Sequence, residues 1–180
     1  METTDVRLTL FLINCMSGIH QGSQKPLPKE NRPRNLSQFK IHDGDLIYLE
    51  STAIGENFRC HTDVRVMQGS EGDRHQIWSM QIISMIHNEG LPSSISRSQL
   101  REFIFRARLA GYEQTRARIA EGKSFCLFDI PKREEDGLTY EETIDDNLHF
   151  FTGDETVKYK HPRSTRSERV YTAYYQGGRL

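Results

Sequence analysis

The stretch FRCHTDVRVM, residues 58–67, decides the fold class, because its apolar side chains alternate with charged or polar ones. Successive side chains of a β-strand point to opposite faces, so this pattern predicts a strand with one buried and one wet face. One wet face is typical of antiparallel sheets. Residues 5–14 alternate similarly and predict a second such strand. We therefore predict an α+β fold, a small antiparallel sheet with two or three helices packed on it.

A first helix is predicted over residues 74–88, directly after this strand. Asp73 and Gln76 have the spacing of a capping box, in which two side chains satisfy the free backbone N–H groups of a helix start. Apolar residues such as Trp78 and Ile82 then recur at helical spacing. Gly90, with Pro92 beyond it, supplies the expected end of this helix.

A second helical region is predicted over residues 97–120. Ser96 and Gln99 offer another capping box, and apolar residues follow at positions i, i+3, i+4 and i+7. Gly111 divides the region into two helices in this interpretation. Residues 103–109 also alternate, so a strand or hairpin remains the alternative.

The 180 residues suit a single domain. We expect four parts: a first core strand over 1–16, a basic, proline-rich, mobile loop over 17–40, the remainder of the globular domain over 41–155 with an acidic segment at 129–155, and a basic C-terminal segment over 156–180 that holds a last strand.

Charge is balanced overall but unevenly placed. The 24 lysines and arginines nearly cancel the 25 acids, so the net charge of −1 gives no general attraction to nucleic acid or membrane. The acidic segment is followed at once by the basic one, and such complementary blocks predict contacts between copies of the chain. The candidate self-association residues are Glu134, Glu135, Asp136, Arg163, Arg166 and Arg169.

Basic residues of the second helical region and of the mobile loop form a candidate surface for an anionic partner, such as RNA or lipid headgroups. They are Arg101, Arg106, Arg108, Arg116 and Arg118 with Lys25, Lys29, Arg32 and Arg34. The alternative is a solvated helix face with i,i+4 ion pairs such as Glu102 with Arg106.

Motifs for catalysis, metals and cofactors are not found in the sequence. Cys15, Cys60 and Cys126 lie too far apart for paired zinc ligands, so we expect no metal, no cofactor and no enzyme activity. A small hydrolase that uses Cys60 or Cys126 would need a histidine beside the thiol. No apolar run approaches the ~20 residues of a membrane span, and the acidic first residues do not fit a secretory signal. We expect an intracellular, cytoplasmic protein.

The size of the chain, its proline-rich basic loop, the strand at 58–67 and the helix at 74–88 resemble the matrix proteins of rhabdoviruses, particularly the short ones of plant-infecting members. The resemblance covers residues 57–130. It implies a structural adaptor that self-associates, condenses the nucleocapsid and meets the membrane, with a place in the virion.

These patterns predict a non-enzymatic structural or adaptor protein that self-associates. The resemblance implies that this protein is a viral matrix protein that bridges nucleocapsid and membrane. The expected partners are a second copy of the chain, nucleoprotein or RNA, and an anionic membrane surface bound peripherally. The alternative is an RNA-binding regulator such as a viral silencing suppressor.

Overall fold

An eight-stranded sheet dominates the computed structural model, which describes residues 3–28, 33, 35–55, 59–127, 130–147 and 149–180. The strand order is β1-β2-β3-β4-β8-β7-β6-β5, and every neighbouring pair is antiparallel. The strands are β1 Leu36–Asp43, β2 Leu46–Ile54, β3 Arg59–Gln68, β4 His75–Ile86, β5 Arg133–Glu135, β6 Leu138–Asn147, β7 Phe150–Lys160 and β8 Ser167–Arg179.

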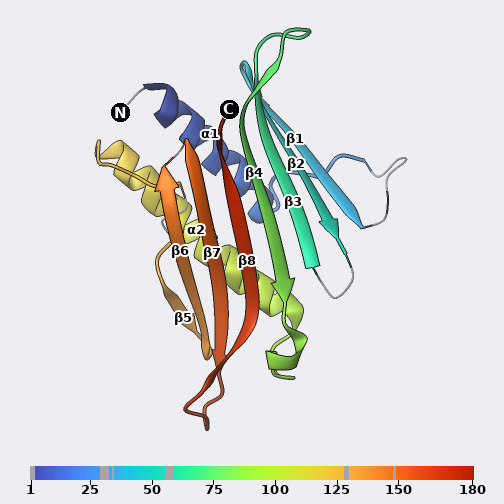
Figure 1. Ribbon diagram of the computed structural model, residues 1–180, viewed down its shortest axis with the longest axis vertical. Coiled ribbons are helices and arrows are strands. Elements are labelled where there is room, and N and C mark those ends of the chain that lie inside the picture. Colours follow the sequence, from blue (N-terminus) through green and yellow to red (C-terminus); the bar gives the residue numbers. More distant parts are fainter. Residues whose placement is uncertain (1–2, 29–32, 34, 56–58, 128–129, 148) are drawn as a thin grey trace.

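Two helices, α1 (Thr3–His20) and α2 (Arg97–Ala120), cover one face of this sheet (Figure 1). A short 3₁₀ turn, η2 (Asn88–Gly90), connects β4 to the segment before α2. The predicted fold class was therefore wrong: the sheet is large and dominates the molecule, and the helices are the smaller part.

The two halves of the chain have the same order of secondary-structure elements. In each half a helix is followed by a four-stranded antiparallel meander: α1 with β1–β4, then α2 with β5–β8. The last strands of the two meanders, β4 and β8, pair with each other at the centre of the sheet. The meander starts β1 and β5 therefore form the two edges, and both helices pack on the same inner face.

The first element is a helix, so the strand predicted over residues 1–16 was wrong. Its buried side chains recur at spacings of three and four: Leu8, Phe11, Leu12, Cys15 and Met16. The leucines at positions 8, 10 and 12 also alternate, which imitates a strand over a short window. The helical spacing becomes visible only when the pattern is followed beyond Asn14.

The loop predicted over residues 17–40 is shorter than expected, because α1 continues to His20 and β1 begins at Leu36. Part of the connection is also held in place. The N–H of Leu27 donates to the carbonyl of Gln38 at 2.8 Å, so the connection lies against the edge strand β1 there.

The predicted helix over residues 74–88 is β4. Trp78, Met80 and Ile82 face the helices, while Ile83 is 48% exposed on the outer face. Isoleucine is β-branched and suits a strand, and β4 has a paired neighbour on each side. Pairing with two distant segments outweighed the local capping signal.

The capping box at the start of α2 is confirmed. The backbone N–H of Gln99 donates to the Ser96 hydroxyl at 3.2 Å, and the N–H of Ser96 donates to the Gln99 side chain at 2.8 Å. The break predicted at Gly111 was wrong, because α2 is continuous. A Cβ atom at Gly111 would lie 2.6 Å from Ile130, so glycine serves the close approach of the segment around Ile130.

The C-terminal segment, predicted as an appendage, forms the centre of the sheet. β8 lies between β4 and β7, and it buries Val170, Tyr171, Ala173 and Tyr175. The acidic segment likewise contributes whole strands, β5, β6 and half of β7. The boundary at 155/156 therefore falls inside β7 and separates nothing.

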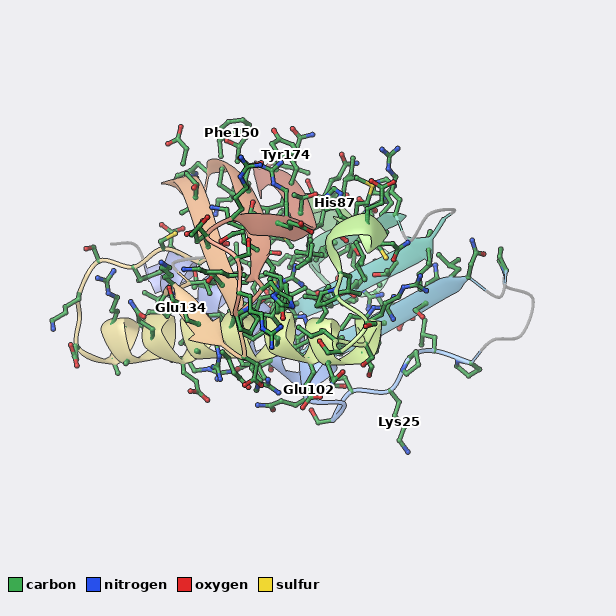
Figure 2. The ribbon with its side chains drawn as sticks, turned by 90° about the horizontal axis from the view of Figure 1, so that it is seen from below. Lys25, His87, Glu102, Glu134, Phe150 and Tyr174 are labelled. Atoms are coloured by element: carbon green, nitrogen blue, oxygen red, sulfur yellow. The ribbon has the colours of Figure 1, made fainter. Side chains whose placement is uncertain are left out.

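Among the residues that the structure describes, no helix lies on the outer face of the sheet. Figure 2 shows Phe150 and Tyr174 on this face, on the side of the sheet away from α2. Glu102 lies on α2, and Lys25 projects from the segment that follows α1. The hydrophobic core therefore lies between the helices and the inner face, which is also where the candidate site is found.

Candidate functional site

A cavity of about 340 Å³ lies between the two helices and the inner face of the sheet. This volume falls within the roughly 300–1,000 Å³ of typical ligand sites. Ile54, Arg101 and Phe105 line the cavity and are exposed, so they mark its opening. The apolar wall further inside consists of Met16, Ile19, Val64, Met80, Ile82, Ile86 and Ile104.

The pleat of the strands explains which side chains face the cavity. Every second residue of a strand points to the same face. The register places Thr52, Thr62 and Ile82 in one row across β2, β3 and β4. Glu50 and Val64 belong to the next row. The wall is therefore apolar with a few polar groups, as in most small-molecule sites.

A buried ion pair closes one side of the cavity. The Arg108 guanidinium on α2 donates from Nε to Glu155 Oε1 at 2.8 Å and from Nη2 to Glu155 Oε2 at 2.5 Å. The two side chains are only 13% and 4% exposed. Tyr140 and Tyr171 donate their hydroxyls to the same carboxylate at 2.9 and 3.3 Å. The positive charge of Arg108 is thus matched within the protein.

A second carboxyl, Glu142 on β6, stands directly opposite Glu155 on β7. Burial and the nearby Glu155 raise the pKa of Glu142 to about 8. It is hydrogen-bonded to the Tyr175 hydroxyl and accepts from the N–H of Ile130 at 3.0 Å. Gly153 makes room for the Tyr175 ring, since a Cβ there would lie 2.4 Å from it. Glu142 is therefore mostly protonated at neutral pH.

Glu50 on β2 is the third inward carboxyl, and it lies in the cavity wall. It accepts hydrogen bonds from the hydroxyls of Tyr48 at 2.6 Å and of Thr52 at 3.3 Å. Burial raises its pKa. Among the described residues, no lysine, arginine or histidine nitrogen lies within 4.0 Å of its oxygens. Glu50 thus differs from Glu155, which has its own cation.

His20 at the end of α1 also lines the cavity. Its ring stacks on Phe105 and Tyr112 of α2, with centroids 4.7 and 5.9 Å apart. Burial, and secondarily the charge of Arg108, lower its pKa to about 3. Its Nδ1 atom is buried without a hydrogen-bond partner in the part of the chain that the structure describes. The imidazole is therefore neutral at physiological pH.

The arginines predicted to form one anionic-partner surface point in different directions. Arg108 faces the interior, which corrects its assignment to an exposed surface. Arg106 pairs with Glu102 at 2.9 Å, as the i,i+4 alternative expects, and with Glu135 at 2.8 Å. Arg106 and Arg108 therefore do not lie on one shared surface.

Arg116 ties the two helices together by donating to Asn14 at 2.9 Å and to Ser17 at 3.3 Å. Arg101 is exposed at the cavity opening, and Arg118 is half-buried. Of the loop residues, Lys25 is exposed, while Lys29, Arg32 and Arg34 lie outside the described residues.

Two of the three acidic candidates for self-association, Glu134 and Glu135, have ion-pair partners within the chain. Glu134 pairs with Lys132 at 2.9 Å, Glu135 pairs with Arg106 and Arg133, and Asp136 lies in the turn between β5 and β6. Arg163 and Arg166 are exposed between the end of β7 and the start of β8, and Arg169 is exposed in the first residues of β8. The two groups lie at the same end of the sheet, because the Lys160 N–H donates to the Gly137 carbonyl at 2.9 Å.

Cys15, Cys60 and Cys126 are not joined in a disulfide bond; Cys15 is buried, and Cys60 and Cys126 are half-buried. Cys60 lines the cavity. Across the described ranges, no three histidine, cysteine or acidic side chains gather closely enough to hold a metal ion. In the same ranges, neither helix has the length and apolar character needed to cross a membrane.

Sequence reasoning missed the cavity, although a signal was present. Leu46–Glu50 and Leu138–Glu142 share the pattern L-x-Y-x-E, and each follows an Asp-Gly turn. The two segments begin the equivalent strands β2 and β6 of the two halves. Their tyrosines are fully buried and their glutamates face the helices. An internal repeat with an inward carboxyl would have pointed to this face.

The resemblance to rhabdovirus matrix proteins rested partly on a helix over residues 74–88, where the structure has strand β4. The order of elements is therefore not the one on which that resemblance was based. Comparisons with protein-family models, with curated proteins and with solved structures find no match for this chain.

Proposed function

We propose that the protein binds a small, mostly apolar molecule in the cavity between its helices and the inner face of the sheet. The observation that supports this proposal is the cavity itself: about 340 Å³ with an apolar wall and a few inward polar groups. At the roughly 30 Å³ that a molecule of liquid water takes up, this space suits about ten non-hydrogen atoms.

Apolar burial supplies the driving force for such binding. Transfer of an eight-carbon chain out of water is worth about 6 kcal/mol at ~0.8 kcal/mol per methylene group. Loss of translational and rotational freedom offsets part of it. We expect dissociation constants of roughly 1 µM to 1 mM for molecules of this size.

We propose a binding role without catalysis, because two of the carboxyl groups beside the cavity, Glu155 and Glu142, already have partners within the protein. Glu155 is neutralised by Arg108 and bonded by two tyrosines. The Glu142 carboxyl is bonded to Tyr175 and Ile130. Groups held in this way form part of the cavity wall. The shape of the cavity and its remaining polar atoms then determine which ligand binds.

Filling the cavity is expected to abolish binding. Thr62 lies on β3 with its side chain in the cavity wall, and the phenyl ring of Thr62→Phe would occupy the space that a ligand needs. We expect octan-1-ol, titrated calorimetrically, to bind the natural protein and to bind Thr62→Phe at least tenfold more weakly. The matched control is Thr143→Phe, because Thr143 is exposed on β6 of the same sheet. Its affinity should stay within twofold.

Two results would contradict the proposal. One is octan-1-ol binding with the same affinity in Thr62→Phe and in the natural protein. The other is no heat of binding for octan-1-ol up to its solubility limit. Circular dichroism and thermal unfolding of both variants establish that each is folded before the comparison is made.

The structural or adaptor role, self-association and RNA binding stay predictions beside this proposal. No arrangement of the described residues favours RNA binding, since Arg108 is turned inward and Arg106 and Arg116 have partners within the chain. Light scattering across a salt series tests self-association, because contacts between the exposed charge blocks should be strongest at low salt.

A further inference from the structure

The charges in the cavity wall differ in one respect that bears on the ligand. Arg108 and Glu155 face each other in a two-pronged pair, so together they add no net charge. Glu50 has only hydroxyl partners, Tyr48 and Thr52. Among the described residues no cation makes an ion pair with Glu50 within 4.0 Å, and the charge of Arg108 acts on this carboxyl only from a greater distance.

A carboxylate that is partly out of water and has no cation is held at a cost in free energy. Burial raises the pKa of Glu50, which reports the same cost. The charge of a ligand ammonium group in contact with Glu50 would offset it, and such charge-assisted hydrogen bonds are stronger than neutral ones. The hydroxyls of Thr52 and Thr62, 2.9 Å apart, add acceptor oxygens beside it.

Two cations of the wall, Arg101 and Arg108, also act on a ligand cation. The charge of Arg108 is matched by Glu155, and Arg101 is exposed to solvent at the opening. His20 is neutral at physiological pH, since its pKa is lowered to about 3, so it brings no like charge to the cavity. An anionic ligand meets the opposite situation. It would face Glu50, and it would have to displace Glu155 from Arg108, whose guanidinium already has a bidentate carboxylate partner.

We infer that the ligand of the cavity is an amine with a short apolar tail, its ammonium group on Glu50 and its tail between α2 and β4. This inference rests on the proposed function, because it names the class of molecule that the same cavity takes. The tail would contact Ile82 and Ile104, and the head would lie near β2 and β3.

Three molecules with the same eight-carbon chain test the inference: octylamine, octan-1-ol and octanoate, each titrated calorimetrically into the natural protein at pH 7.5. Octylamine is fully charged at this pH, as a lysine side chain is. We expect octylamine to bind at least tenfold more tightly than octan-1-ol. Octanoate should bind most weakly of the three. This comparison needs no variant, so it does not depend on the folding of one.

Glu50→Gln keeps the shape of the side chain and one acceptor oxygen for the Tyr48 hydroxyl, its amide N–H can donate to the Thr52 hydroxyl, and its charge is removed. We expect this variant to lower the affinity for octylamine at least tenfold, while its affinity for octan-1-ol changes by less than threefold. The matched control is Glu142→Gln, at the equivalent position of the other half and outside the cavity lining. Because Glu142 is mostly protonated at neutral pH, this control should keep the preference for octylamine.

The possible outcomes distinguish failure of the amine preference from failure of the binding cavity itself. Octan-1-ol or octanoate binding as tightly as octylamine would overturn the inference and leave the binding cavity in place. An unchanged preference for octylamine in Glu50→Gln would also overturn it. If none of the three molecules binds, the proposed function itself fails.

Discussion

Replacement of Arg108 by methionine is expected to cost about 3–5 kcal/mol of the free energy of unfolding, because it leaves the Glu155 carboxylate buried without its cation. Most domains have only about 5–15 kcal/mol in total, so the variant should unfold at a much lower urea concentration than the natural protein. Urea unfolding followed by circular dichroism measures the difference.

Two further variants show that the uncompensated charge is the cause. Arg108→Met/Glu155→Gln removes both charges, keeps one acceptor oxygen for a tyrosine hydroxyl and offers an amide N–H to the other, so it should be more stable than Arg108→Met alone. Arg106→Met is the matched control two residues away, where the ion pairs are exposed and worth less than about 1 kcal/mol. Equal losses at positions 106 and 108 would contradict the description of the site.

Removal of strand β8 is expected to abolish folding. A chain that ends at Pro162 lacks the strand that pairs with both β4 and β7, so its sheet would divide into two unconnected meanders. It would also lose the buried Val170, Tyr171, Ala173 and Tyr175. Thermal unfolding followed by circular dichroism should show no cooperative transition for this chain.

The control for the truncation changes charge and leaves the strand intact. Arg163 and Arg166 are exposed before β8 begins, and exposed charges seldom matter by more than about 0.5 kcal/mol. Arg163→Glu/Arg166→Glu should therefore keep the thermal midpoint within a few degrees of the natural value. A truncated chain with a natural-like transition would show that β8 is not needed for the sheet.

Local signals predicted some elements correctly. The alternation of residues 59–67 corresponds to β3, where Arg59, His61 and Arg65 are exposed while Val64 and Val66 are buried. Residue 58 lies outside the described residues. The capping box at Ser96 starts α2 as expected. In both cases the pattern and its tertiary environment agree, so the local preference was sufficient.

Other elements could not be predicted from a short window. The leucines of α1 fit a period of two as well as a helical period. Only their burial against the sheet distinguishes the helix from a strand. β4 carries helix-like start residues, yet it is a strand because β3 and β8 both pair with it. Such pairing depends on segments far away in the sequence, which single-window patterns do not contain.

The site was less predictable than the fold. Arg106 and Arg108 look equivalent in the sequence, but Arg108 turns inward because Glu155, 47 residues later, stands opposite it on β7. The recurring L-x-Y-x-E pattern of β2 and β6 was the available clue. The pattern can be interpreted once the two halves are recognised as structural repeats. Equivalent positions of β2 and β6 then place both glutamates on the inner face of the sheet.

Intermolecular nuclear Overhauser effects between octan-1-ol and the isoleucine methyl groups would locate a bound molecule directly. Ile82 and Ile83 are neighbours on β4, but Ile82 lines the cavity and Ile83 is 48% exposed on the outer face. We predict contacts from the bound alcohol to Ile82 and to Ile104 of α2, and none to Ile83. Contacts to Ile83 without contacts to Ile82 and Ile104, or no contacts at all, would contradict a ligand-binding cavity between the helices and the sheet.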